Sequence, residues 1–275
     1  MRHGESQGNQ DSSIYSTIPD HAIGLTQRGE QQAHQAGLEL KTLMKNETIF
    51  FYVSPFHRSK RTCELISQAF EQKQVISVRE DPRIREQEWG NFQELASRAA
   101  IVIERQKIGR FFYRFKDGES GADVYDRVSS FMDSMFREMD NHAMSEHNIC
   151  IVSHGLFMRL FLMRFFRWSV EKFHTLENFD NCGYCILEKD EKTGSYYLKT
   201  ELKVYPYIKP TSIYTNNKSN KLIEKNIEMS FEAEVNPNIH SDEIRHSNTS
   251  VKQTNTNKQE PKVETNQATN EQLDV

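Results

Sequence analysis

The sequence predicts an α/β fold, a three-layer sandwich in which helices flank a mainly parallel central sheet. Helix-like and strand-like segments alternate over residues 1–205, which is typical of a parallel sheet with helical crossovers. Residues 49–54 (IFFYVS) and 148–153 (NICIVS) are short, mostly apolar runs, the pattern of strands that are buried on both faces. A helix-like segment follows closely after each run, so both observations favour the same fold class.

Apolar residues at three- and four-residue steps predict the helices. Thr26 can cap a helix over residues 25–45, which carries apolar side chains along one face. Residues 120–139 repeat apolar side chains at the same steps, starting at Val124. Further helices are expected over residues 57–70 and 156–166, and shorter strands over residues 75–78, 185–188 and 197–204.

Composition divides the chain into a domain over residues 1–205 and a polar, largely disordered tail over residues 206–275. Hydrophobic residues make up 36% of the chain, below the share of about 45–50%, glycine included, that is usual for globular proteins. The polar excess lies in the tail, which buries too little apolar surface to offset the loss of chain entropy. Within it, residues 221–235 could form an amphipathic helix that binds a partner, but an inert tail is favoured.

Charge and cysteine content exclude several function classes. The formal net charge is −4 and neither sign dominates, so we expect no nucleic acid and no anionic membrane as a partner. No apolar run reaches the roughly 18 residues of a membrane span and no secretory signal opens the sequence, so we expect a cytoplasmic protein with reduced thiols. Cys182 and Cys185 form a C-x-x-C motif that leads into a strand, which favours a structural role over a redox or zinc site.

Four separated segments combine histidine, arginine and glutamate side chains. Two of them begin where an expected strand ends, and in open α/β sheets ligands bind at the carboxyl ends of the strands. Each segment alone is a weak signal, because a lone Arg-His-Gly or Ser-His-Gly is most often an ordinary loop or turn. The four segments are residues 2–9 (RHGESQGN), 54–62 (SPFHRSKRT), 85–90 (REQEWG) and 153–155 (SHG).

Together these residue types meet the needs of phosphoryl transfer to a histidine. The nucleophile must be a neutral imidazole nitrogen that is held in one tautomer. Arginine forks bind the charged phosphate oxygens two at a time, and a second histidine can donate from the same pocket. The guanidinium groups also disfavour the imidazolium and so keep the nucleophile neutral. A carboxylic acid with a raised pKa can protonate the leaving oxygen.

On these segments, nearly all of residues 1–205 resembles the histidine phosphatase superfamily in its phosphoglycerate mutase-like branch. Supporting matches are residues 25–33 (LTQRGEQQA), residues 118–128 (GESGADVYDRV) and the pair Asn181-Cys182. Within that branch, residues 83–87 (RIREQ) and 111–115 (FFYRF) are most similar to the broad-specificity acid phosphatases of fungi.

The resemblance implies a role for seven positions. His3 would be the phosphorylated nucleophile, and Glu86 would be the proton donor. The phosphate would be held by two arginines, a histidine, a polar side chain and a backbone donor, which match Arg2, Arg58, His154, Asn9 and Gly155. No metal and no organic cofactor is implied, and the expected partner is a small phosphorylated substrate. Loops around residues 10–24 and 92–118 would set the specificity.

A phosphatase that hydrolyses phosphomonoesters is favoured over a phosphoglycerate mutase-type phosphotransferase. Mutases of this branch carry a Glu-Arg-His-Tyr-Gly segment, followed by paired arginines that grip the carboxylate of phosphoglycerate. The matching residues 86–90 read EQEWG, in which Glu88 adds negative charge, and no Arg-Arg pair follows. A catalytically weak phospho-ligand-binding scaffold is the third alternative, although the intact set of site residues argues against it.

Other basic segments have a structural and a functional interpretation. Residues 105–116 interleave basic and aromatic side chains, which could either line an access groove for substrate or pack their aromatics on the core. Arginines in the helix after Gly155 are expected to reach out to solvent from a core helix, rather than to bind a membrane surface; they are Arg159, Arg164 and Arg167. His57 is expected to face solvent.

The N-terminal triplet departs from the resemblance in one respect. In this superfamily Arg-His-Gly ends a central strand, so an apolar run should precede it, but here only Met1 does. Losing such a strand removes several buried side chains at about 1.5–3 kcal/mol each, which approaches the whole stability of a domain, about 5–15 kcal/mol. We therefore expect that the first strand is truncated in this sequence and that the natural chain extends upstream, which mass spectrometry of the native protein would test.

Overall fold

The computed structural model describes residues 1–90, 98–140 and 146–204, apart from the side chains of residues 98–100 and 102–103. The predicted tail, including the stretch 221–235, lies outside the described residues. The helices are α1 (Gln7–Gln10), α2 (Gln27–Met44), α3 (His57–Ser67), α4 (Arg98–Ile108), α5 (Gly121–Asp140), α6 (Gly155–Phe165) and α7 (Val170–Thr175). Short 3-10 helices are η1 (Ser12–Ser16), η2 (Asp20–Ala22) and η3 (Pro82–Ile84). The strands are β1 (Ile49–Val53), β2 (Val75–Glu80), β3 (Asn148–Val152), β4 (Leu187–Lys189) and β5 (Tyr196–Leu198).

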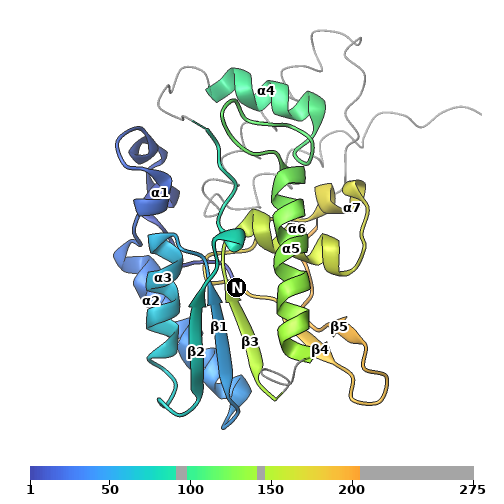
Figure 1. Ribbon diagram of the computed structural model, residues 1–275. Coiled ribbons are helices and arrows are strands. Elements are labelled where there is room, and N and C mark those ends of the chain that lie inside the picture. The colour runs from blue at the N-terminus through green and yellow to red at the C-terminus, as the bar shows by residue number, and fades with distance from the viewer. Residues whose placement is uncertain (91–97, 141–145, 205–275) are drawn as a thin grey trace, which may run out of the picture. The chain divides into compact units, whose positions relative to one another are not determined.

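The central sheet has three parallel strands in the order β2-β1-β3 (Figure 1). Side chains alternate along β1, so Ile49, Phe51 and Val53 belong to one core cluster, and Phe50 and Tyr52 belong to another. Helices α2 and α3 contribute to the first cluster, and α5 and α6 contribute to the second. The predicted three-layer α/β sandwich with a parallel sheet is therefore confirmed.

Strand β3 is less buried than its apolar sequence predicts. Asn148 is exposed, residues 149–151 are half-buried and Val152 is buried, whereas β1 is buried throughout. One edge of β3 pairs with β1, while the backbone contacts at its other edge come from Met1 and His3 near the carboxyl end. The expectation of a fully buried strand is wrong, because among the described residues no strand pairs with that second edge.

The last two strands are shorter than predicted and form a sheet of their own. β4 and β5 pair antiparallel, with Leu187 opposite Leu198. β5 ends at Leu198 rather than at residue 204, and Val204 instead makes an isolated bridge to Leu176. The pair stands beside the parallel sheet as a hairpin (Figure 1).

The long helices begin and end close to their predicted bounds. The Thr26 hydroxyl accepts the N–H of Gly29 at 3.0 Å, which confirms Thr26 as the cap of α2. The apolar face of α5 is buried, including Val124 and Phe131. α3 is shorter than predicted and ends at Ser67. Elements α1, α4 and α7 were not predicted, because they are short or lack a clear apolar repeat.

Helix α6 is a core helix, but one of its arginines does not reach solvent as predicted. Arg159 is only 2% exposed. Its guanidinium lies 5.5 Å from the centre of the Phe173 ring and donates to the Leu176 carbonyl at 3.5 Å. Both partners belong to α7 and the residue after it, so an element that the sequence pattern missed covers Arg159. Arg167 is exposed, and Arg164 is half-buried, where it donates to the Ser129 hydroxyl at 3.0 Å.

The aromatics of residues 105–116 mostly pack on the core. Phe111, Tyr113 and Phe115 are buried, while Phe112 is 60% exposed. Arg105 is buried too, with its guanidinium 5.4 Å from the ring centres of Trp89 and Phe115. The structure therefore supports the packing interpretation over an open basic groove.

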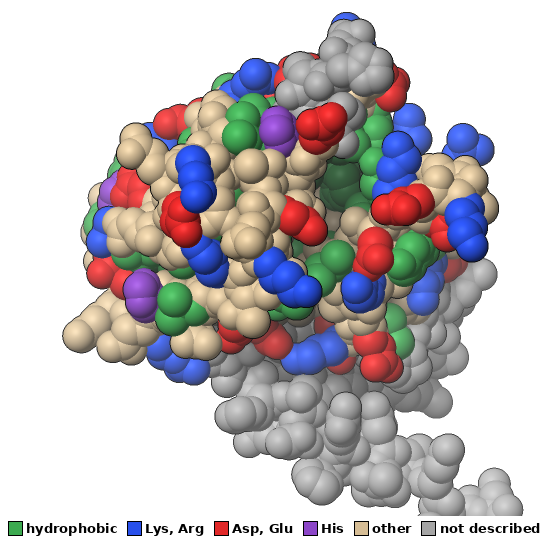
Figure 2. Space-filling view, turned by 90° about the horizontal axis from the view of Figure 1, so that it is seen from below, with side chains coloured by type: hydrophobic (Ala, Val, Ile, Leu, Met, Phe, Trp, Pro, Cys, Tyr) green, Lys and Arg blue, Asp and Glu red, His purple; other side chains and the backbone are tan. Residues whose placement is uncertain are grey.

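All four cysteines are free, and burial raises the pKa of the Cys182 thiol to about 12. None of the helices in the described part of the chain is long and apolar enough to cross a membrane. Figure 2 shows the face that is seen from below in Figure 1, where acidic and basic side chains are interspersed.

Candidate active site

His3 lies at the carboxyl end of the sheet, between β3 and the loop that carries Cys182. Its N–H donates to the Ser153 carbonyl at 3.0 Å, and its own carbonyl accepts the Cys182 N–H at 3.2 Å. Gly4 follows where α2 approaches, and a Cβ on Gly4 would overlap the carbonyl oxygen of Gly29. Backbone pairing on both sides therefore fixes the histidine, and close packing on α2 explains the glycine beside it.

The hydrogen bonds of the His3 ring select one tautomer. Nδ1 lies 2.7 Å from the Gly4 carbonyl oxygen, which can only accept, so Nδ1 carries the hydrogen. Nε2 accepts from the Nε of Arg58 at 3.3 Å. Burial, together with the charges of Arg58 and Arg2, holds the pKa of His3 well below its ordinary value of 6.5. His3 is therefore a buried, neutral imidazole with a lone pair on Nε2.

Arg58 stands in the first turn of α3 and is held by Asp20 of η2. Its Nη1 donates to the Asp20 carbonyl at 2.7 Å and to the Asp20 carboxylate at 2.8 Å. The guanidinium also lies over the Phe56 ring, 4.9 Å from its centre. Burial opposes the charge and is the largest single influence, but Asp20, Tyr15 and Glu86 together outweigh it and raise the pKa of Arg58. One edge of the guanidinium is thus held by Asp20, and the Nε of Arg58 faces His3.

Arg2 supplies a second buried positive charge. Its Nη1 donates to the Phe179 carbonyl at 2.6 Å. Burial lowers the pKa of Arg2 to about 10, so the guanidinium stays protonated at neutral pH. Its charge acts on His3 and on Glu86, which places Arg2 within the same group of residues.

His154 caps the N-terminus of α6 and is fully buried. Its Nε2 lies 2.8 Å from the Ser54 hydroxyl at the end of β1. The ring meets the His3 ring edge-on, with 5.2 Å between centres. Nδ1 lies 3.9 Å from a Glu86 carboxylate oxygen and has no hydrogen-bond partner among the described residues. Burial and the charge of Arg58 lower the pKa of His154, so this ring is also neutral.

Glu86 follows η3 on irregular backbone, with a side chain that is 18% exposed. Its Oε1 accepts the N–H of Gln87 at 2.9 Å, and its other oxygen faces His154. Burial raises the pKa of Glu86 above the ordinary 4.5, although Gln87 and the arginines oppose this. A buried carboxyl group with a raised pKa is suited to donate a proton.

Asn9 and Gly155 adjoin this group. Asn9 is buried in α1, and its Oδ1 accepts from the Nδ2 of Asn181, which also donates to the His3 carbonyl at 3.3 Å. Gly155 is the first residue of α6, where a Cβ would overlap the Asn178 side chain. The N-terminus of α6 follows His154 directly, and helix N-termini favour anions.

All seven residues predicted for the site therefore lie around His3 or at the start of α6, and two further residues join them. Asp20 ties Arg58, and Tyr15 of η1 packs its ring against Gly8. Burial raises the pKa of Tyr15 to about 12, and Arg58 and Asp20 are the charges that act on it most. Neither residue belongs to a repeat or a motif of the sequence. Their only signal was an acid and an aromatic in the loop over residues 10–24.

At the carboxyl end of the parallel sheet, a buried neutral histidine thus lies with two arginines, a second histidine and an acid, which are the residue types that phosphoryl transfer to a histidine requires. The sequence profile described as the histidine phosphatase superfamily (branch 1) matches residues 1–199. The chain belongs to this superfamily.

Its curated relatives carry two kinds of name. The chain is 48% identical to the phosphoglycerate mutase-like protein AT74H of Arabidopsis thaliana, over 68% of this chain and 72% of that protein. It is 29% identical to the broad-range acid phosphatase DET1 of Saccharomyces cerevisiae, over 74% of this chain and 88% of that protein.

Solved structures share the fold. Mycobacterial hydrolase 1 superimposes with a TM-score of 0.57 at 19% identity, over 74% of this chain and 97% of that one. The mycobacterial glucosyl-3-phosphoglycerate phosphatase in complex with VO3 superimposes with a TM-score of 0.54 at 19% identity, over 74% of this chain and 95% of that one. At this identity the likeness shows the fold alone.

Proposed function

We propose that this protein is a phosphatase that hydrolyses small phosphomonoesters through a phosphohistidine at His3. The observation that carries the proposal is the state of the His3 ring, whose Nδ1 is bound by the Gly4 carbonyl while Nε2 accepts from Arg58. A buried neutral imidazole whose Nε2 lone pair faces a guanidinium is placed to attack a phosphorus atom that the guanidinium binds in its stead.

In the first step, Nε2 of His3 attacks the phosphorus in line with the leaving oxygen. The P–N bond forms as the P–O bond breaks, and the leaving oxygen takes the proton of the Glu86 carboxyl group. Charge on the equatorial oxygens meets Arg2, Arg58, the ring of His154 and the start of α6. The proton on Nδ1 stays on the ring, where the Gly4 carbonyl stabilises the positive charge that develops.

In the second step, water attacks the phosphohistidine. The Glu86 carboxylate takes a proton from the water, the P–N bond breaks, and inorganic phosphate leaves. His3 returns to its neutral form, because burial and the two arginines disfavour the imidazolium. Glu86 thus acts first as an acid and then as a base, and its raised pKa serves the first role.

The other expectations from the sequence complete the proposal. The catalytic domain would span residues 1–205, the polar tail residues 206–275, and the protein would act in the cytoplasm without a metal or organic cofactor.

The test of this function is hydrolysis of p-nitrophenyl phosphate by wild-type protein and by His3→Ala. We expect the variant to lose at least about a thousandfold in rate, because the nucleophile is gone. A radiolabelled phosphomonoester should leave acid-labile label on the wild-type protein and none on the variant. His57→Ala is the matched control, since His57 is the exposed first residue of α3, and the rate of this variant should not change. Equal rates for wild type and His3→Ala would refute the proposal.

Phosphoglycerate mutase-type phosphotransfer is the second candidate, favoured by the name of the Arabidopsis relative. Against it, Glu88 is exposed beside the site and pairs with Arg85 at 3.3 Å, where a mutase would place a cation-rich grip. Incubation with phosphoglycerate and a bisphosphate primer separates the two. Net release of inorganic phosphate supports the phosphatase. Exchange of phosphate between positions without release supports the mutase, and a protein that binds phosphate without turning over is a scaffold.

A further inference from the structure

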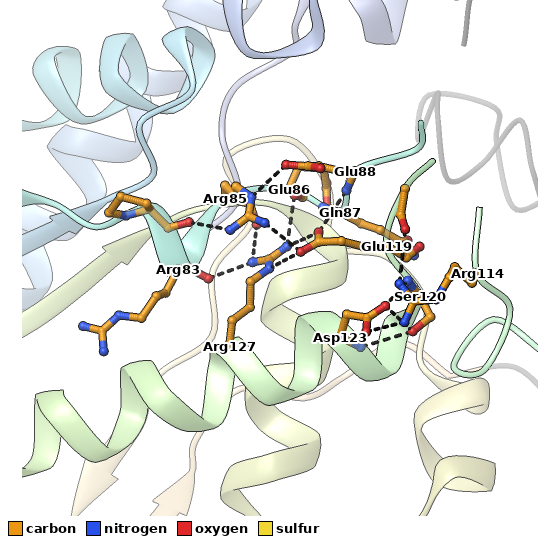
Figure 3. Close-up of polar contacts among 12 residues, drawn as sticks. Arg83, Arg85, Glu86, Gln87, Glu88, Arg114, Glu119, Ser120, Asp123 and Arg127 are labelled. Atoms are coloured by element: carbon orange, nitrogen blue, oxygen red, sulfur yellow. Dashed lines mark hydrogen bonds and ion pairs between the residues drawn. The ribbon is translucent and has the colours of Figure 1, made fainter. Parts of the chain in front are cut away.

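The proton donor proposed above stands on backbone that has no regular hydrogen-bond ladder of its own. Residues 85–90 follow η3 without helix or strand. Such a segment keeps one conformation only if other parts of the chain bind its carbonyl and N–H groups. The groups that do so come from α5 and from the turn before it (Figure 3).

Arg127 of α5 binds three backbone carbonyl oxygens, two in this segment and one in η3 just before it. Its Nη1 donates to the carbonyl of Arg83 at 2.7 Å and to that of Arg85 at 2.8 Å, and its Nη2 donates to the carbonyl of Glu86 at 3.0 Å (Figure 3). The guanidinium is planar and rigid, so three acceptors on one fork fix both the position and the direction of the backbone at Glu86. The Arg127 side chain is only 10% exposed, which keeps water from competing for these bonds.

Glu119 completes the arrangement from the other side. Its carboxylate pairs with Arg127 through both oxygens, at 3.0 Å to Nε and 2.9 Å to Nη2. The same carboxylate accepts from Arg85 at 2.8 Å and from the backbone N–H of Glu88 at 3.0 Å. The backbone of Glu119 also exchanges bonds with this segment, because its N–H donates to the Glu88 carbonyl and its carbonyl accepts from the Gln87 side chain.

We propose that Arg127 and Glu119 are positioning residues for the phosphatase reaction, which hold the Glu86 carboxyl group where it can protonate the leaving oxygen. This inference rests on the function proposed above. Neither side chain has a hydrogen bond to His3, Arg2 or Arg58 among the described residues, so the pair acts through the backbone of Glu86 rather than on the phosphate. Glu119 also balances the charge of Arg127, which would otherwise favour the ionised form of the nearby acid.

If Glu86 is misplaced while the fold is intact, the rates on different substrates should change by different factors, whereas a general loss of structure should lower all rates alike. The proton from Glu86 matters most when the leaving oxygen is basic, as in an alkyl phosphate, and least when it is a nitrophenolate, which leaves without help. Misplacing Glu86 should therefore slow the hydrolysis of an alkyl phosphate more than the hydrolysis of an aryl phosphate. Binding of inorganic phosphate, which does not use the acid, should be unchanged.

The experiment compares kcat/KM for glycerol phosphate and p-nitrophenyl phosphate in wild type, Arg127→Lys and Glu119→Gln. Lysine keeps the charge but cannot bind three carbonyls in a fixed fork. In each variant we expect kcat/KM for glycerol phosphate to fall by a factor at least about tenfold larger than the fall in kcat/KM for p-nitrophenyl phosphate. The inhibition constant for inorganic phosphate should stay within about twofold of the wild-type value. If Arg127→Lys does not fold, as circular dichroism would reveal, the isosteric Glu119→Gln carries the test.

Arg114→Lys is the matched control. Arg114 also binds this turn, through the Asp123 carboxylate and the Gly118 carbonyl, but its side chain is 60% exposed and makes no hydrogen bond to residues 83–88 (Figure 3). Both of its rates should stay at the wild-type level. Equal losses on the two substrates in Arg127→Lys and Glu119→Gln would overturn the positioning role while leaving the phosphatase intact. A wild type without His3-dependent hydrolysis would overturn the proposed function itself, and the inference with it.

Discussion

At the scale of the residue, the two edges of the Arg58 guanidinium have different tasks. Asp20 accepts from Nη1 with its carbonyl and its carboxylate, so this edge is occupied. The Nε of the other edge points to Nε2 of His3 at 3.3 Å. An arginine with a free side chain would lose rotamer entropy when it binds phosphate, whereas one that is already tied does not. Asp20 therefore prepares Arg58 for the substrate.

Asp20→Ala should weaken phosphate binding. We expect KM for p-nitrophenyl phosphate to rise about tenfold, near the low end of the roughly 1.5–3 kcal/mol that a hydrogen bond to a charged group contributes. Steady-state kinetics at fixed pH measure it, and Asp11→Ala, an exposed acid in the same loop, is the control. An unchanged or lower KM would mean that Asp20 competes with phosphate for Arg58 instead of preparing it.

The pKa shifts of His3 and Glu86 set the direction of the pH dependence. His3 must be neutral, and burial with Arg58 and Arg2 keeps it so until well below pH 6.5. Glu86 must be protonated in the first step, and burial raises its pKa above 4.5, so the acid form persists to higher pH than in water. Activity should therefore rise with pH through the pKa of His3 and fall as the pH rises through that of Glu86.

We predict that kcat/KM for an alkyl phosphate declines on the alkaline side with the pKa of Glu86. Glu86→Gln, which cannot release a proton, should be slower by about a hundredfold or more and should lose this alkaline limb. A pH–rate profile of wild type and variant measures both. Glu88→Gln, which alters the exposed carboxylate two residues on, should keep the limb. A wild-type rate that climbs steadily between about pH 5 and 8 would contradict the assignment of Glu86 as the acid.

At the scale of the element, helix α5 serves the core and the site at once. Val124 and Phe131 are buried in the core on one side of the sheet, and Arg127 stands three residues after the first and four before the second, so it lies on the same side of the helix. Its long side chain continues past the core to the carbonyls around Glu86. The packing of α5 therefore decides where the backbone of the proton donor lies.

Phe131→Ala should show how much this packing contributes to stability. The ring is fully buried, 5.1 Å from the Tyr52 ring on β1 and 6.1 Å from the Phe157 ring on α6. We expect the free energy of unfolding to fall by about 3–5 kcal/mol, measured by denaturant titration. Phe112→Ala removes the same side chain from a site that is 60% exposed and should cost about 0.5 kcal/mol or less. Similar losses in the two variants would show that α5 is not part of the core.

At the scale of the whole molecule, the alternation of apolar segments was enough to predict three layers. The apolar run of residues 49–54 predicts a strand that is buried on both faces, and the apolar residues of 120–139 predict a helix with one buried face. The structure confirms both predictions. The pattern failed at β3, whose burial depends on a neighbour at its second edge, and at Arg159, which α7 covers. The local sequence shows which face of a helix or strand is apolar. It does not show which other element packs against that face.

The candidate site, like the fold, has features that the sequence predicts and features that depend on how the chain packs. The residue types of the site could be predicted from the sequence, because His3, Arg58, Glu86 and His154 lie in four short segments, two of which begin where a predicted strand ends. Three contacts could be seen only in the folded chain: the hydrogen bond that selects the tautomer of His3, the bond of Asp20 to Arg58, and the bond of Arg127 to the carbonyl of Glu86. The physical reason is that a repeat in the sequence specifies a buried face, whereas a hydrogen bond between residues that are tens of positions apart depends on where packing brings their backbones together.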